Sequence, residues 1–192
     1  MNGALETLIS QAIGRSNSKS QSIACLNRGR IIVALAFVPI VALLWPIDKV
    51  LVAIGQDPET SRYARVYVVG QLPGLFMQAQ FDCNMRYLSA YKKSYIPMLT
   101  QLVSTILHVG WCQLLISHCR LGVCGASLAI CITYSTNFAV LVFYTTVIDK
   151  DERIIWSLGR QAFSDSSSYL RLGIPGTLMI MLDMWCYEII TL

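Results

Sequence analysis

The sequence predicts an all-α fold: a polytopic membrane helical bundle with about five spanning helices and a remnant of one more. Hydrophobic residues make up 55% of the chain, and the mean hydropathy is +0.54. Charged residues make up only 14%, whereas soluble domains carry roughly 25%. Long uncharged runs recur along the chain and cover residues 31–47, 66–81, 94–119 and 121–148.

The segment before the first run is too short to cross a membrane. Residues 2–14 would form a helix about 20 Å long, whereas the hydrocarbon core of a bilayer is about 30 Å thick. The segment has no basic start followed by an apolar core and a cleavage site, so it is not a signal peptide. We expect it to be the end of a helix whose beginning is absent.

The first two runs reach spanning length only with help from their neighbours. Residues 31–47 become long enough if Asp48 and Lys49 extend their charged ends to the interface and residues 50–55 complete the helix. Residues 66–81 form the weakest span and must borrow a few residues at each end. Both runs are nevertheless predicted to be spanning helices.

The connections between the runs are short. Residues 56–61 (QDPETS) predict a turn, with Pro58 as the helix breaker and Thr60 or Ser61 as the cap of the next helix. The two later runs each exceed the roughly 20 residues that a spanning helix needs, so they are predicted to span without help.

Small residues and one histidine indicate how the helices pack. Gly70 and Gly74 form a G-x-x-x-G pattern, which is suited to close helix contact. A second small face contains Gly122, Gly125 and Ala126. His108 and Cys112 share a helix face, but no further ligands at metal-binding spacing accompany them. We therefore favour a hydrogen-bonded interior histidine over a metal site.

The final segment, residues 172–192, is apolar apart from two carboxylates, Asp183 and Glu188. As a helix it would place Asp183 roughly 18 Å beyond Arg171, near the middle of a bilayer. A carboxylate at that depth is costly unless it is protonated, paired or facing water. Two interpretations stay open: a proton- or cation-binding site, or an acid satisfied by a partner helix.

The basic residues predict the orientation of the helices in the membrane. Eleven of the 15 lysines and arginines lie in residues 15–30, 86–93 and 149–171, on one side of the predicted helices. Because cytoplasmic loops carry the excess of Lys and Arg, this side is predicted to be cytoplasmic. The net charge of +4 therefore reflects the basic loops on the cytoplasmic side of the membrane, and no nucleic-acid partner is predicted. Residues 149–171 are either an amphipathic helix on the inner leaflet or part of the bundle.

The sequence contains no arrangement typical of an enzyme. It has no phosphate-binding glycine loop, no Ser/His/Asp pattern and no H-E-x-x-H. Its seven cysteines include no C-x-x-C pair, and most are expected to act as small hydrophobic residues. Cys119 and Cys124 bracket an outer turn and are the pair that we consider for a disulfide.

Five motifs, in order, resemble those of the multidrug and toxic compound extrusion (MATE) family. Residues 3–14 (GALETLISQAIG) resemble the family's G-A-L-[DE]-T-L-x-x-Q-A-x-G signature. Residues 172–189 resemble the L-x-I-P-x-x-L-M-x-x-L-E-x-W-x-Y-E-I pattern of eukaryotic members. The motifs between them are residues 54–59 (IGQDPE), 73–76 (PGLF) with 86–88 (RYL), and His108 with 121–130 (LGVCGASLAI). The resemblance covers essentially all of the chain.

The resemblance implies a place in a larger transporter. Family members are secondary antiporters with twelve helices in two lobes, and they exchange protons or sodium ions for organic, mostly cationic compounds. By this comparison, residues 1–148 are most of the first lobe, from the end of helix 2 to helix 6. Residues 149–171 are a cytoplasmic connection, and residues 172–192 are the truncated start of the second lobe, helix 7. We expect the chain to be a fragment of such a protein or an incomplete gene model, with the missing transporter helices as partners.

The resemblance also makes the two acids of the final segment a predicted site. Asp183 and Glu188 are expected to couple protons or cations and to bind substrate; Asp183 stands where eukaryotic relatives usually have Glu. Trp185 and Tyr187 are candidate aromatic contacts for a cation, although ordinary packing or an interfacial belt explains them equally well. Further supporting positions are Pro175, Glu6 and Gln11. No catalytic residue, metal site or cofactor is predicted, and the coupling ion is H⁺ or Na⁺.

The function predicted from these features is secondary active antiport, and not enzyme catalysis. Small organic cations or xenobiotics would be exported in exchange for protons by an integral, multi-pass protein of the lipid bilayer. The membrane is either the plasma membrane or a vacuolar or vesicular one. Two alternatives stay open: a non-transporting membrane fragment that acts by helix packing, and a related lipid-linked sugar flippase of the same superfamily.

Overall fold

The structure, a computed structural model, describes residues 19–148 and a few positions near each end of the chain: 9, 10, 175, 178, 179, 181, 182, 185–187, 189 and 190. The elements of the continuous part are helices, which confirms the predicted all-α class. They are α2 (Lys19–Leu44), α3 (Ile47–Ala53), α4 (Pro58–Ala90), α5 (Tyr95–Cys112), the π-helical segment η1 (Gln113–His118), α6 (Gly122–Phe143) and the π-helical segment η2 (Tyr144–Ile148).

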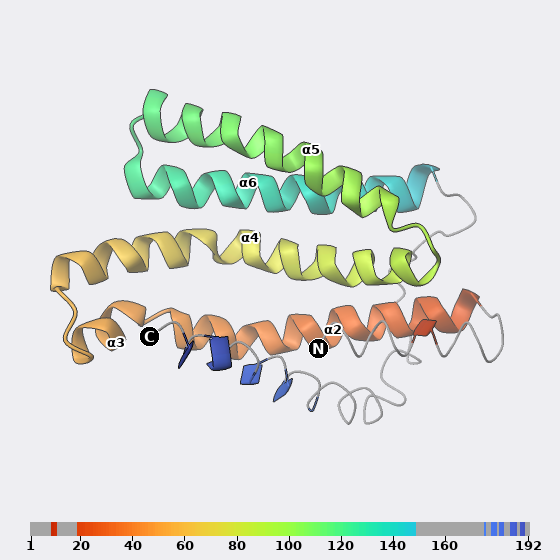
Figure 1. Cartoon of the computed structure of the whole chain (residues 1–192), viewed down its shortest axis with the longest axis horizontal. Helices are drawn as coiled ribbons and strands as arrows, with labels where there is room; N and C mark the ends of the chain where they lie inside the picture. Colours follow the sequence, from red (N-terminus) through yellow and green to blue (C-terminus); the bar gives the residue numbers. More distant parts are fainter. Residues whose placement is uncertain are drawn as a thin grey trace.

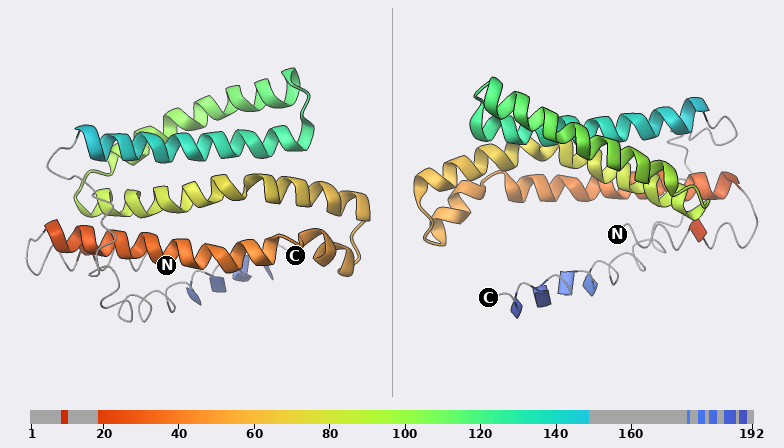
Figure 2. Two further views of the ribbon diagram at one scale, coloured as in Figure 1. Left: turned by 180° about the vertical axis from the view of Figure 1, so that it is seen from behind. Right: turned by 45° about the horizontal axis from the view of Figure 1, so that its top comes forward.

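The long helices lie side by side in the order α2, α4, α6 and α5 (Figure 1). Helix α4 is central, because it contacts α2 on one side and α6 on the other. The short helix α3 packs against α4 near the start of that helix, and Figure 2 shows α5 crossing α6 at an angle. Helices that follow each other in sequence are therefore not always neighbours: α6 lies between α4 and α5.

Several of these helices have the length and composition of membrane spans. Within the described residues, the stretches long and apolar enough to cross a bilayer are Ser22–Leu44, Tyr95–His118 and Gly122–Val147. Helix α4 has 33 residues, which makes it about 50 Å long. Its length alone exceeds the hydrocarbon core of a bilayer, which is about 30 Å thick.

Helix α2 begins and ends earlier than the sequence predicts. It contains Arg28 and Arg30, which the charge pattern assigns to a loop. It ends at Leu44, because Pro46 has no amide hydrogen with which to continue the helical ladder. The predicted continuation through residues 50–55 is therefore wrong, and those residues belong mainly to the separate helix α3.

Helix α4 is capped by Asp57, and not by Thr60 or Ser61 as the sequence predicts. Oδ2 of Asp57 accepts a hydrogen bond from the backbone amide of Thr60 at 3.0 Å. Pro58 occupies the first helical position, where no amide hydrogen is needed and the fixed φ of proline suits a helix. Pro58 therefore starts the helix, and the two residues expected as caps lie inside its first turn.

A tight turn joins η1 to α6. Gly122 has a φ of 53°, in the left-handed region that glycine adopts most easily, and open space surrounds it. The predicted role of Gly122 in helix packing is therefore wrong. At Gly125 the prediction of close packing is confirmed, because an added Cβ would lie 2.9 Å from the backbone oxygen of Leu115. Cys119 and Cys124 flank the turn as free, exposed thiols, so the disulfide that we considered is not formed.

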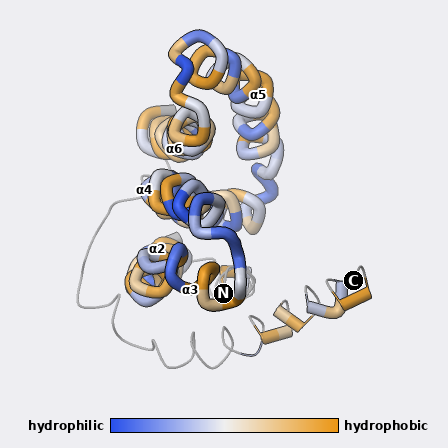
Figure 3. Tube along the Cα trace, turned by 90° about the vertical axis from the view of Figure 1, so that its left-hand side faces the viewer, coloured by the Kyte–Doolittle hydropathy of each residue, from blue (hydrophilic) through white to orange (hydrophobic). Residues whose placement is uncertain are grey.

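The bundle is apolar on its outside and carries polar side chains within. Leu43, Ile106 and Val109 are 74%, 66% and 64% exposed, whereas Asn84 and Asn137 are fully buried. Hydrophobic stretches recur along the outer helices (Figure 3). Large apolar side chains on the outside suit a lipid surrounding, because hydrocarbon, unlike water, does not penalise their exposure.

Candidate functional site

Four predicted site residues lie outside the described part of the chain: Asp183, Glu188, Glu6 and Gln11. The structure describes the three other predicted positions, Pro175, Trp185 and Tyr187, and all three are exposed. An exposed aromatic ring is compatible both with an interfacial belt and with a contact to a cation. The coupling role of the two acids stays a prediction.

A buried polar cluster, formed by Arg30, Gln80 and Asn84, joins α2 to α4. Nη2 of Arg30 donates to Oδ1 of Asn84, and Nδ2 of Asn84 donates to the backbone oxygen of Gln80 at 3.1 Å. Nε2 of Gln80 donates to the backbone oxygen of Arg30 at 3.4 Å. The exposed fractions of the three residues are 4%, 3% and 0%. Because buried polar groups need such partners in place of water, the cluster fixes α2 against α4.

A second polar contact joins α5 to α6 at His108. Nδ1 of His108 lies 2.8 Å from Oγ1 of Thr133, whose hydroxyl donates to the backbone oxygen of Ala129 at 2.9 Å. The threonine oxygen must therefore accept from Nδ1–H, which leaves Nε2 to accept from the thiol of Cys112 at 3.4 Å. His108 is half-buried and hydrogen-bonded through both ring nitrogens, which confirms the predicted hydrogen bonding. Within the described residues, no group of three or more potential metal ligands occurs.

The contact between α4 and α6 confirms the G-x-x-x-G prediction. A Cβ on Gly70 would lie 2.5 Å from Oγ of Ser127, and a Cβ on Gly74 would lie 2.7 Å from Cα of Cys131. In the space that the glycines leave, Sγ of Cys131 donates to the backbone oxygen of Gly70 and accepts from the backbone amide of Gly74, both at 3.2 Å. Close packing and hydrogen bonds hold these helices together, as is usual for helices in lipid.

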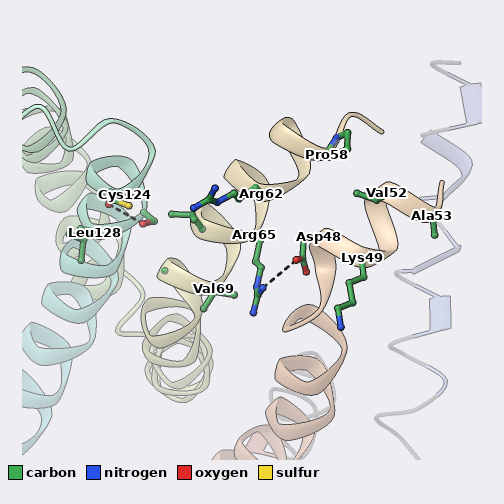
Figure 4. Close-up of a pocket in the computed structure, with 13 residues that line it drawn as sticks. Asp48, Lys49, Val52, Ala53, Pro58, Arg62, Arg65, Val69, Cys124 and Leu128 are labelled. Atoms are coloured by element: carbon green, nitrogen blue, oxygen red, sulfur yellow. Dashed lines mark hydrogen bonds and ion pairs between the residues drawn. The ribbon is translucent and has the colours of Figure 1, made fainter. Parts of the chain in front are cut away.

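Open grooves occur on the described bundle, and two of them carry charged side chains. The larger, of about 1110 Å³, lies between α3, α4 and α6 and contains an ion pair in which Oδ2 of Asp48 and Nη1 of Arg65 are 3.2 Å apart (Figure 4). The smaller, of about 740 Å³, lies between α4 and α5 and contains Asp82, which accepts from Nε2 of Gln78 at 3.2 Å. Both grooves combine charged and apolar side chains, so their chemistry suits amphiphilic molecules.

The buried cluster is not apparent from the apolar pattern, which shows residues 66–81 as one uncharged run that ends at Asp82. Gln80 and Asn84 do carry a signal, since residues four apart share a helix face. Their partner Arg30 is 54 residues away from Asn84. Its positive charge is typical of a loop, so its burial is not readable from the local sequence.

Apolar helices of spanning length, joined by buried polar contacts, define the class of the protein: an integral membrane helical bundle. The comparison with known families is more specific. Residues 1–114 match the model of the MatE family. The chain therefore belongs to the MATE family of membrane transporters.

Individual relatives support this membership. Protein DETOXIFICATION 16 of Arabidopsis thaliana is 30% identical over 98% of this chain and 39% of its own length. Multidrug and toxin extrusion protein 2 of Mus musculus is 31% identical over 97% of this chain and 32% of its own length. The crystal structure of the eukaryotic MATE transporter AtDTX14 matches with a TM-score of 0.87 and 27% identity, over 98% of this chain and 42% of that one. The chain thus spans about two-fifths or less of the length of these relatives.

Proposed function

We propose that the protein works as a secondary active antiporter that exports small organic, mostly cationic compounds or xenobiotics in exchange for protons. The observation that carries this proposal is the match of 98% of the chain to a MATE transporter structure with a TM-score of 0.87. The names of the similar multidrug and toxin extrusion proteins favour drug-like substrates.

In this proposal, residues 1–148 form most of one transporter lobe, residues 149–171 form a cytoplasmic connection, and residues 172–192 begin the second lobe. The described helices support the proposal because α4 is tied to α2 by the Arg30 cluster and to α6 by Cys131. Helices tied in this way move together, as alternating access by the rocking of one half against another requires.

Asp183 is the proposed coupling group, and Glu188 assists it. Near the middle of the bilayer, hydrocarbon favours the neutral, protonated carboxyl, whereas an arriving organic cation favours the carboxylate. A proton and a cation therefore oppose each other's binding, and this negative coupling is what exchange needs thermodynamically. Pro175 can bend the segment and so redirect both acids.

The test uses the full protein that the cell makes. The gene sequence upstream of the Met1 codon and downstream of the Leu192 codon gives the length of that protein. Proteoliposomes that contain the protein and carry an imposed pH gradient should accumulate tetraethylammonium, and a protonophore should stop the accumulation. A wild-type protein that shows no pH-driven uptake of any organic cation tested would refute antiport.

Two substitutions test the coupling group. Asp183→Asn should abolish pH-driven uptake while the protein still folds and inserts, whereas Asp183→Glu should retain uptake because it keeps the ionisable group. Normal pH-dependent transport by Asp183→Asn would assign coupling to Glu188 or to a residue outside this chain.

A further inference from the structure

The larger groove has a basic mouth and apolar walls. Helix α4 forms its floor, and α3 and α6 form its sides (Figure 4). Lys49 on α3 and Arg62 and Arg65 on α4 supply positive charge, and Val69 and Leu128 are among the apolar side chains that line the groove. The volume of about 1110 Å³ is far larger than an inorganic ion requires.

The charge of the groove is not balanced within the described residues. Asp48 is the one carboxylate that lines the groove there, and it pairs with Arg65. Figure 4 shows Arg65 pointing to Asp48, whereas Arg62 reaches from α4 toward the Cys124 end of α6. Lys49 and Arg62 therefore leave a net positive charge, which favours an anionic group at this end.

The polarity of the groove is ordered along the axis of α4. On α4 the lining residues are Pro58 at the start of the helix, then Arg62 and Arg65, and then Val66, Val69 and Gly70. The stretch from Arg62 to Gly70 is about 12 Å long. A free phosphate would occupy only the basic mouth. A molecule with a phosphate at one end and a hydrocarbon chain at the other would use both ends, and the surrounding bilayer supplies such molecules.

We propose that this groove is a binding site for a membrane phospholipid. Its phosphate lies at Arg62, between α4 and α6, and an acyl chain runs past Val69 and Leu128. Basic residues near a membrane surface attract phosphate headgroups, and apolar walls replace the lipid neighbours of the chain. The site is independent of the proposed coupling by Asp183.

Two native thiols make the proposal measurable. Cys124 lines the groove, whereas Cys119 lies at the same end of the bundle outside it, and both are exposed. In detergent solution, dioctanoyl phosphatidylglycerol should slow the maleimide alkylation of Cys124 several-fold in the full protein and leave Cys119 unchanged. Inorganic phosphate at the same concentration should protect neither thiol. Peptide mass spectrometry reports the two alkylation rates separately.

Matched variants decide which side chain holds the lipid. Arg62→Gln should raise the lipid concentration needed for protection about fivefold, as expected for one lost contact to an anionic headgroup. Arg120→Gln removes a positive charge at the same end but outside the groove, and it should leave protection unchanged. Each result is a ratio of rates with and without lipid, so a change in the intrinsic reactivity of the thiol cancels.

Three outcomes would overturn the proposal. Equal alkylation of Cys124 with and without lipid would show that the groove is empty of lipid or already covered by protein. Protection by inorganic phosphate alone would identify a small anion as the ligand. Protection that survives Arg62→Gln unchanged would show that the lipid does not bind at the basic mouth.

Discussion

The backbone amide of Gly74 lies 3.2 Å from the sulfur of Cys131, an approach that is possible because Gly74 has no side chain. The same sulfur donates to the backbone oxygen of Gly70, one turn earlier. One small side chain of α6 thus holds two backbone groups of α4. Since apolar burial gives little drive for association inside lipid, such contacts carry much of the stability of the bundle.

Gly74→Ala should destabilise the bundle by about 1–3 kcal/mol, because the new methyl group would overlap the backbone of Cys131. Gly110→Ala is the matched control, since nothing lies within 4 Å of a Cβ added there. The control should be neutral or stabilising by about 0.5–1 kcal/mol. Thermal unfolding in detergent, followed by tryptophan fluorescence, compares the two. Equal stability of Gly74→Ala and the wild type would contradict this contact.

Arg30→Met and Asn84→Leu should each destabilise the protein by about 1–3 kcal/mol, because each leaves a buried partner without its hydrogen bond. The double variant should be less destabilised than the sum of the two, because neither polar partner then remains. Denaturant unfolding of the three variants gives the coupling energy. Strictly additive effects would show that the two side chains do not interact. As a control, Arg120→Met at an exposed position should change stability by no more than about 0.5 kcal/mol.

Asp57 should make stability depend on pH in the acidic range. The backbone amide of Thr60 is the main cause that holds the pKa of the Asp57 carboxyl below its ordinary value, and the Thr60 hydroxyl and the Glu59 amide add to it. Because the folded pKa is lower than the unfolded one, the stabilisation is complete above the unfolded pKa and is lost as the pH falls through the folded pKa. The loss should begin below about pH 4.

Asp57→Asn tests this pH dependence, because the amide keeps an acceptor for the cap but has no carboxyl to titrate. The midpoint of thermal unfolding should fall less between about pH 5 and about pH 3 in this variant than in the wild type. The same fall in both proteins would assign the acid sensitivity to other groups.

The orientation of the bundle can be checked by labelling single cysteines in intact cells. The background carries serine at the exposed native thiols Cys119, Cys124 and Cys186. Arg62→Cys should react with an impermeant maleimide from outside, and Ser157→Cys should react only after permeabilisation, because the excess of basic residues marks the cytoplasmic side. Labelling of position 157 in intact cells would reverse the predicted topology.

The helices that the sequence predicts best are those whose ends coincide with the ends of uncharged runs. Residues 94–119 contain α5 and η1, and residues 121–148 contain α6 and η2. A helix in lipid must satisfy its own backbone over its whole apolar length, so hydropathy reports it directly. The start of α2 is not predicted in this way. Arg30 lies inside the helix and is buried because it contacts Asn84, which is far away in the sequence.

The candidate sites also differ in how far the sequence alone predicts them. The spacing of Gly70 and Gly74 predicts a close helix contact, since one residue type at one interval is sufficient for it. The basic groove combines residues of α3, α4 and α6, which only the fold brings together. The acids Asp183 and Glu188 are readable from the sequence because a charge inside an apolar segment is a local signal.

Helix α4 carries cations near both of its ends, with Arg65 toward its start and Arg86 toward its finish. Along the helix they are about 32 Å apart, close to the roughly 30 Å of a hydrocarbon core. Sliding α4 along the membrane normal by one turn would draw one of these cations into hydrocarbon, at a cost of several kcal/mol. The bundle is thereby held at a fixed depth. A tilt about an axis in the membrane plane keeps both cations nearer to the membrane surfaces, so this spacing favours tilting over elevator-like travel.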